Sequence, residues 1–227
     1  MFESKSGVFL VGGIGMFALA FLSNALVPWL MYAHLGEKTT EQMIEEQKHR
    51  PFNILTVMNQ LRDEYPDQVK KYITDGKDVD FTKDPAAIKT VADTLRYGRK
   101  IYVGEACWHC HSQFVRPVAN ESRRYGPVAN SKEFANELQR PVLFGTRRVG
   151  PDLSREGGRR SNDWHATHFF KPKWTSGEGT VMPEYPWFFD GDPGKPNHRG
   201  LALILYMQFQ SSWLETYPYS PIVEEQR

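Results

Sequence analysis

Residues 6 to 33 contain no charged side chain, and this stretch limits the possible folds of the chain more than any other feature. Its sequence is SGVFLVGGIGMFALAFLSNALVPWLMYA. About 20 apolar residues are enough for a helix to cross the hydrocarbon core of a membrane. The apolar region of a cleaved secretory signal measures only about 7–15 residues. The sequence therefore predicts a retained transmembrane anchor over residues 6–33, in preference to a cleaved signal or a buried core helix.

Aromatic and glycine residues add detail to this anchor. Trp29 and Tyr32 lie where the aromatic belt at a membrane surface is expected. Gly12, Gly13 and Gly15 give the helix one slim face, which favours close approach by a neighbouring membrane helix.

The charges around the anchor predict its orientation. Glu3 and Lys5 precede it, whereas Glu37 and Lys38 follow it, with further glutamates beyond. The positive-inside rule counts basic residues in short flanks, and the small difference here favours a cytoplasmic amino terminus. We therefore expect the remainder of the chain to be exported.

The balance of charge argues against one class of function. The chain has 28 lysines and arginines against 27 aspartates and glutamates, a net charge of +1. Binding to nucleic-acid phosphates requires a basic excess, and neither common glycine-rich phosphate loop is present. We therefore expect no nucleic-acid partner.

The part after the anchor is predicted to be mainly helical. Residues 34–93 are expected to form a polar helical linker region, with helices over residues 39–49 and 51–65. A longer helix is expected to start near Pro85. Residues 112–150 are rich in proline, asparagine, arginine and glycine, which indicates long loops with short helices. Residues 199–213 predict a compact amphipathic helix, too short to span a membrane.

Both cysteines of the chain fall within one pentapeptide, Cys107-Trp108-His109-Cys110-His111. Such a pair suits a disulfide, a thioredoxin-like redox site after a strand, a zinc site with further ligands, or covalent haem c. In haem c two thiols add to the two vinyl groups, and the histidine that follows binds the iron. This spacing favours haem c, attached at Cys107 and Cys110 and ligated by His111, while the other three chemistries stay open on the pentapeptide alone.

A second axial ligand is expected after the motif, where Met182, Met207, His165, His168 and His198 are the candidates. Met182 is favoured because its loop, TSGEGTVMPEYPWF, is stiffened by prolines and can fold over a haem face. Met207 is expected in the core of the terminal helix. His165 and His168 are expected on a helix that lines the pocket.

The segment RRVGPDLSREGG lies between the two expected ligands. An imidazole that binds a metal almost always donates its other N–H group to a nearby acceptor. Pro151 has no N–H group, so its carbonyl can be aimed from a rigid turn. We expect this carbonyl to accept the hydrogen bond from His111.

Together these features resemble class I cytochromes c, which have a first helix, a CxxCH motif, a GP-x-L turn, a methionine loop and a terminal helix. In that fold the terminal helix crosses the first through a glycine and aromatic residues. Gly98 and Tyr102 match this crossing, against Leu203 and Tyr206. The resemblance implies a mainly α fold, with a single N-terminal transmembrane helix and a class I cytochrome c domain that carries long loop insertions.

Four segments narrow the resemblance to one family: GRKIYVGEACWHCHSQFVRP, RRYG, RRVGPDLSREGGRRSNDWHATHF and MPEYPW. They are similar to the mono-haem subunit (FixO or CcoO, subunit II) of cbb3-type cytochrome c oxidases, over the anchor and about residues 94–215. The family implies one covalent haem c that relays electrons of aerobic respiration to a catalytic haem–copper subunit. It also implies a bacterial inner membrane, with the haem domain on the periplasmic side.

The resemblance implies partners as well: the catalytic haem–copper oxidase subunit, a further cytochrome c subunit, and soluble cytochrome c as an alternative donor. The long loops, with Arg116, Arg123 and Arg124, are expected to contact the catalytic partner. The chain is expected to transfer electrons without being catalytic alone. Two alternatives stay open, a subunit of a related haem–copper nitric oxide reductase and a haem-based sensor with an open sixth position.

These expectations divide the chain into four parts. They are the anchor over residues 6–33, the linker region over 34–93, the cytochrome c haem domain over 94–215 and a C-terminal tail over 216–227.

Overall fold

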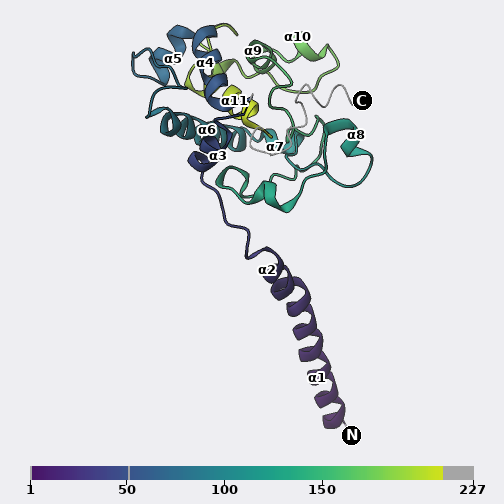
Figure 1. Cartoon of the computed structure of the whole chain (residues 1–227). Coiled ribbons are helices and arrows are strands. Elements are labelled where there is room, and N and C mark those ends of the chain that lie inside the picture. Colours follow the sequence, from purple (N-terminus) through teal and green to yellow (C-terminus); the bar gives the residue numbers. More distant parts are fainter. Residues whose placement is uncertain (1, 51, 212–227) are drawn as a thin grey trace. The chain divides into compact units, whose positions relative to one another are not determined.

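The computed structural model describes residues 2–50 and 52–211, and the predicted tail lies outside these ranges. The chain divides into two compact units, Met1–Glu37 and Lys38–Arg227 (Figure 1). Within the described ranges both units are built from helices and turns, with two isolated bridges and no strand. The predicted mainly α fold is thereby confirmed.

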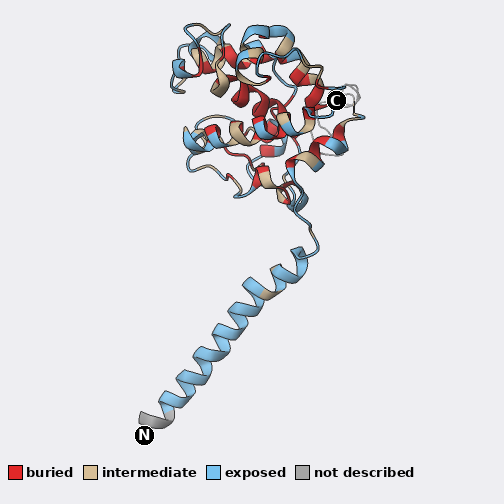
Figure 2. Cartoon of the chain, turned by 90° about the vertical axis from the view of Figure 1, so that its left-hand side faces the viewer, coloured by how far each residue is buried: buried red, intermediate tan, exposed pale blue. Residues whose placement is uncertain are grey.

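The first unit is a long apolar helix near the amino terminus. It runs through α1 (Phe2–Phe21), the π-helical turn η1 (Leu22–Leu26) and α2 (Val27–Tyr32). The segment Lys5–Tyr32 has a mean hydropathy of 2.0, and its most apolar part is not buried at all within the chain (Figure 2). Its length and composition are those of a membrane-spanning helix, which confirms the predicted single N-terminal helix.

The π-helical turn ends at Leu26, two residues before Pro28. Proline has no N–H group and its ring meets the carbonyl four residues earlier, so the regular helix cannot continue unchanged. The side chains of Ser23 and Asn24 bond back to the carbonyls of Leu19 and Ala20, each at 2.9 Å. These polar groups are therefore satisfied inside the helix, as surrounding lipid would require.

The second unit packs short helices and loops around one apolar core (Figure 2). Its elements are α3 (Thr40–Gln47), α4 (Ile54–Glu64), α5 (Pro66–Tyr72), α6 (Ala87–Gly104), α7 (Cys107–Cys110), α8 (Glu121–Tyr125), η2 (Ser131–Phe134), η3 (Glu137–Gln139), α9 (Asn162–Phe170), α10 (Lys173–Ser176), η4 (Pro186–Phe188) and α11 (His198–Phe209). The sequence predicted α3, α4, α6 and α11. Helix α5, which begins at a proline, was not predicted.

The centre of the second unit is the crossing of α6 and α11. A Cβ atom on Gly98 would lie 2.1 Å from the carbonyl oxygen of Ala202 and 2.7 Å from the Cβ of Tyr206. The rings of Tyr102 and Tyr206 lie 5.6 Å apart beside this point. The backbone that meets Gly98 is thus that of Ala202, whereas Leu203 lines the cavity described below.

Helices α3 and α4 belong to the same core, although residues 34–93 were expected to form a linker. Thr39 caps α3 in a capping box with Gln42, and Asn53 caps α4. Both helices pack on α6, and α4 also packs on α11. Met43 and Leu61 are fully buried in the common core. This region therefore helps to position the two helices that carry the site.

Candidate haem-binding site

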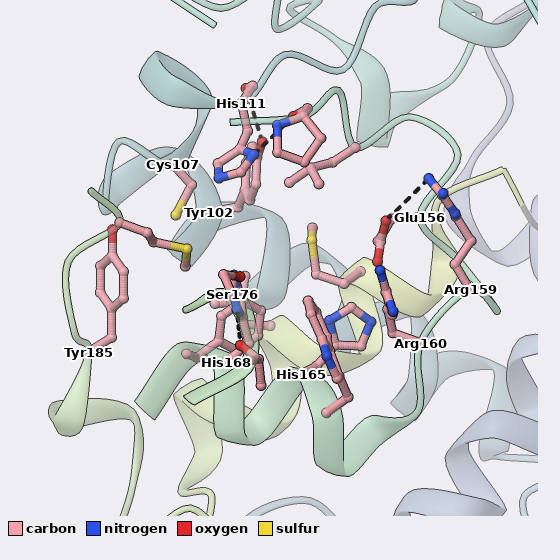
Figure 3. Close-up of a pocket in the computed structure, with 18 of the residues that line it drawn as sticks. Tyr102, Cys107, His111, Glu156, Arg159, Arg160, His165, His168, Ser176 and Tyr185 are labelled. Carbon is pink, nitrogen blue, oxygen red and sulfur yellow. Dashed lines mark hydrogen bonds and ion pairs between the residues drawn. The ribbon is translucent and has the colours of Figure 1, made fainter. Parts of the chain in front are cut away.

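A cavity of about 310 Å³ lies beside α7 and α11, which is within the range of about 300–1,000 Å³ usual for ligand pockets. Its walls come from α6, α7, α9, α11, the loop around Pro151 and the loop around Met182. Figure 3 shows His111, Cys107, Tyr185, His165 and Glu156 arranged around this space. The cavity therefore collects residues that are far apart in the sequence.

Helix α7 presents the two cysteines. It is a single turn that follows Ala106, whose left-handed φ of 58° interrupts the helical path between α6 and α7. Residues three apart lie on the same side of a helical turn, so Cys107 and Cys110 share one side of α7. Cys107 lines the cavity, Cys110 is exposed, and both thiols are free.

The pKa and surroundings of Cys107 help to distinguish haem attachment from a redox pair or a zinc site. Burial raises the pKa of the Cys107 thiol to about 12, whereas the attacking thiol of a redox-active CxxC pair has a lowered pKa. The element before the pair is helix α6, and a thioredoxin-like site needs a strand there. Within residues 2–50 and 52–211 no group of three or more His, Cys, Asp or Glu side chains is placed to hold a metal ion, as a zinc site requires. The geometry thus favours attachment of a cofactor over redox or zinc chemistry.

The imidazole of His111 is held through one of its two nitrogens. Its Nδ1 atom lies 2.9 Å from the carbonyl oxygen of Pro151. A carbonyl can only accept, so Nδ1 carries the proton and Nε2 keeps a lone pair for a metal. Burial in the pocket lowers the pKa of His111, which favours the neutral form that binds iron.

Backbone hydrogen bonds aim the Pro151 carbonyl at this ring. The N–H group of Gly150 donates to the carbonyl of Cys110 at 3.0 Å, and that of Leu153 donates to the carbonyl of Ser112 at 2.9 Å. These two bonds lie on either side of Pro151 along the chain. The loop around Pro151 is therefore held by hydrogen bonds to the segment that carries the motif.

Gly150 lets the loop approach the imidazole closely. A Cβ atom at this position would lie 2.2 Å from Cε1 of His111 and 2.7 Å from its Nδ1. Any other residue would displace the ring or the loop, so the ring rests against backbone that only glycine provides.

A buried polar network next to the site was not predicted from the sequence. The carboxylate of Asp152, 2% exposed, accepts hydrogen bonds from Ser112 Oγ and from the N–H groups of Phe114 and Ser154, the last two at 2.9 Å. Arg148 donates to Ser112 Oγ at 2.6 Å. Ser112 follows His111 and Asp152 follows Pro151, so this network fixes both ends of the His111–Pro151 contact. The only sequence signal for this network is the aspartate that follows Gly150-Pro151.

Two thioethers reach the cavity wall. Met182 lies in the predicted loop, is half-buried and lines the cavity. The end of this loop is anchored by Tyr185, whose N–H group donates to Phe169 at 2.9 Å and whose ring stacks on Phe188. Met207 lines the cavity too, although it is buried in α11. Met182 as the iron ligand stays a prediction.

The histidines of α9 line the cavity, as the sequence suggested for this helix. His165 is 2% exposed, its Nε2 atom has no hydrogen-bond partner within the described residues, and burial lowers its pKa to about 3. The Nδ1 atom of His168 lies 2.6 Å from Thr175 Oγ1, and burial lowers the pKa of His168 to about 4. His198 is not part of the lining and packs against Tyr97.

These residues fit a haem. The cavity combines aromatic walls, two thioethers, an imidazole with a free Nε2 atom, and a glycine cradle behind that imidazole. The unpartnered Nε2 of His165 is a further buried polar atom at this wall. Donors of this kind are those that hold haem iron in cytochromes.

A helical domain with this pocket defines a mono-haem cytochrome, and family comparison agrees. The family model described as "Cytochrome C oxidase, mono-heme subunit/FixO" matches residues 77–200, more than half of the chain. The chain belongs to this FixO family. It is therefore a mono-haem cytochrome c subunit of a haem–copper oxidase, and such a subunit is membrane-bound. Comparison with curated proteins found no match.

Proposed function

We propose that this chain relays single electrons from a cytochrome c donor to the catalytic haem–copper subunit of a cbb3-type terminal oxidase. In this proposal Cys107 and Cys110 hold haem c covalently, and His111 and Met182 are the axial ligands of its iron. The donor is soluble cytochrome c or a further cytochrome c subunit of the complex. The haem domain lies on the periplasmic side of the bacterial inner membrane.

One observation carries the proposal: the hydrogen bond from His111 to Pro151, on the wall that also holds Cys107. It fixes the tautomer and the orientation of an imidazole directly after a CxxC pair. A ligand fixed in this way needs little rearrangement when the charge of the iron changes. Small rearrangement is what rapid electron relay requires.

The bound haem supplies a reversible one-electron change at its iron. The protein supplies aromatic walls, since Tyr102 and Phe188 are fully buried at the pocket and Tyr185 nearly so. A methionine ligand raises the reduction potential relative to a second histidine. Met182 thus suits a carrier that accepts electrons from a cytochrome c donor.

The anchor supports the proposed assembly. Gly12, Gly13 and Gly15 carry no side chain, which permits close approach by a neighbouring membrane helix. We propose that the catalytic subunit packs there.

The three arginines expected at the partner surface differ in their surroundings. Arg116 donates to the carbonyl of Phe144 at 3.1 Å, and Arg124 packs over the ring of Tyr125 at the cavity edge. Arg123 is exposed on α8. Arg123 is therefore the candidate of the three that we retain for partner contact.

Purification of the intact membrane complex through this chain tests the proposal. We expect a large multi-helix haem–copper subunit to accompany it, and His111→Ala to abolish turnover driven by cytochrome c. His49→Ala is the matched control, because His49 is exposed and outside the cavity. Full oxidase turnover in a complex whose chain lacks haem would refute the relay. Turnover with nitric oxide but not with oxygen would select the reductase alternative, and a lone haem protein that binds small ligands at its iron would select the sensor.

A further inference from the structure

A buried guanidinium group lies at the centre of the polar network beside His111. The side chain of Arg148 is 11% exposed, and it is not part of the cavity lining. Its Nε atom donates to Ser112 Oγ at 2.6 Å, and its Nη2 atom donates to the carbonyl of Phe114 at 3.1 Å. The guanidinium group also lies 5.4 Å from the centroid of the Tyr125 ring. Arg148 is therefore held in one position from several sides.

Two buried carboxylates share this guanidinium group. Glu121 Oε1 forms an ion pair with Nη1 of Arg148, and Asp152 Oδ2 lies 3.6 Å from its Nη2. The side chains of Glu121 and Asp152 are 7% and 0% exposed. The hydroxyl, N–H and guanidinium groups that contact Asp152 are donors, which fits its ionised form, an acceptor only. The network therefore contains two negative charges and one positive charge.

Packing alone does not explain why charges are buried here. A buried ion pair is often no more stabilising than apolar side chains of similar volume. The loop around Pro151 is already held by uncharged hydrogen bonds, which the N–H groups of Gly150 and Leu153 donate. A network that only fastened this loop would need no buried carboxylate. The charges themselves therefore need a role.

The charge of Asp152 acts on the ring of His111. Asp152 follows Pro151, whose carbonyl lies 2.9 Å from Nδ1 of that ring. Burial lowers the pKa of His111, whereas the hydrogen bond to Pro151 and the negative charge of Asp152 act in the opposite direction. A negative charge that favours a positive imidazole also favours a more positive iron bound to that imidazole. The positive charge of Arg148 acts with the opposite sign.

We propose that Asp152 and Arg148 are positioning residues that set the reduction potential of the haem through their opposite buried charges. The inference deepens the proposed function and rests on it, since it requires haem iron bound to His111. Ferric iron carries one positive charge more than ferrous iron. The charge of Asp152 therefore stabilises the oxidised form and lowers the potential. The charge of Arg148 stabilises the reduced form and raises the potential.

The test measures the equilibrium reduction potential of the full-length chain, matured with haem, by spectroelectrochemistry. We expect Asp152→Asn, which keeps the size of the side chain, to raise the potential, and Arg148→Gln to lower it. Arg148→Lys keeps the charge and should stay closer to wild type than Arg148→Gln. In the double variant of Asp152→Asn and Arg148→Gln the two shifts should largely cancel. Arg147→Gln is the matched control, an exposed neighbour that should keep the potential of wild type.

Ser112→Ala separates the effect of charge from that of hydrogen bonding. It removes the hydrogen bonds that join Ser112 to Arg148 and Asp152, and it leaves both charges in place. We therefore expect a smaller shift than in Asp152→Asn. The shifts of the charge variants should persist at high salt, because buried charges are screened much less than exposed ones. A rise in Ser112→Ala as large as that in Asp152→Asn would assign the effect to hydrogen bonding and overturn the inference.

A purely structural network predicts shifts of the same sign in Asp152→Asn and Arg148→Gln, because both changes would loosen the same contact of His111. That result would overturn the inference, and so would a potential of Asp152→Asn at or below that of wild type. Asp152→Asn decides the matter alone if Arg148→Gln fails to take up haem. Absence of covalent haem in the wild-type chain would instead refute the proposed function, so the two failures are distinguishable.

Discussion

The Nδ1 atom of His111 lies 2.9 Å from the carbonyl oxygen of Pro151, a residue 40 positions further along the chain. This contact joins a motif at the end of one helix to a loop without regular structure. Its geometry leaves Nε2 of His111 as the nitrogen available to iron.

Covalent haem is the first expectation for Cys107 and Cys110. Denaturing gel electrophoresis of the chain from cells with cytochrome c maturation should give a band that stains for haem peroxidase activity. Cys110→Ser should weaken or abolish this band, because one thioether would be missing. A band without stain in the wild-type chain would show that no covalent haem is formed.

Ligation by Met182 predicts a weak far-red band of sulfur-to-iron charge transfer in the ferric protein. Met182→His should abolish the band and lower the reduction potential. Met207→Leu is the matched control, since Met207 also lines the cavity, and it should keep the band. If Met182→Ala leaves the spectrum and potential unchanged, the ligand is to be sought at His165.

Gly150→Ala should disturb the site directly. The added Cβ atom would meet the His111 ring at 2.2 Å, so the ring must turn away from the Pro151 carbonyl or the loop must move. Overpacking of this kind costs about 1–3 kcal/mol. We expect lower haem incorporation and an altered Soret band. Gly179→Ala, where the Cβ would meet nothing within 4 Å, should behave like wild type, and normal haem spectra in both variants would contradict the account.

The crossing of α6 and α11 predicts a large stability loss in Gly98→Ala. The new Cβ atom would lie 2.1 Å from the backbone carbonyl of Ala202, which cannot yield without separating the helices. We expect a loss of about 3 kcal/mol in the free energy of unfolding, the upper end of the usual cost of overpacking. Denaturant unfolding followed by circular dichroism measures it. Gly104→Ala on the same helix meets nothing within 4 Å and should cause no loss, so equal stability of the two variants would disprove the close crossing.

A retained anchor is expected over residues 6–33. The mature chain should stay in the membrane during alkaline carbonate extraction, and its amino terminus should be near Met1 or Phe2. Release of the chain by carbonate, or an amino terminus at about Ala25 or beyond, would show that the segment is cleaved.

The sequence by itself determined the features whose signal is local. The anchor follows from one uncharged run, and the mainly α fold follows from apolar residues at helical spacing. The structure confirms the mainly α fold and shows one long apolar helix at the predicted anchor, long enough to span a membrane. Placement of His111 directly after Cys110 is also local, because the residues predicted to attach and ligate the haem belong to a single turn and its cap. Such features need no knowledge of distant contacts.

Only the tertiary structure decided what surrounds that turn. The sequence placed residues 34–93 in a linker region, yet α3 and α4 pack on the helices that carry the site, because their apolar faces need a core to cover. Nothing in the sequence indicated that Asp152 is buried and accepts a hydrogen bond from Ser112, or that Glu156 and Arg160 line the cavity. These residues lie in loops, where backbone direction is fixed by long-range hydrogen bonds and glycine contacts, and local spacing carries no information about such partners.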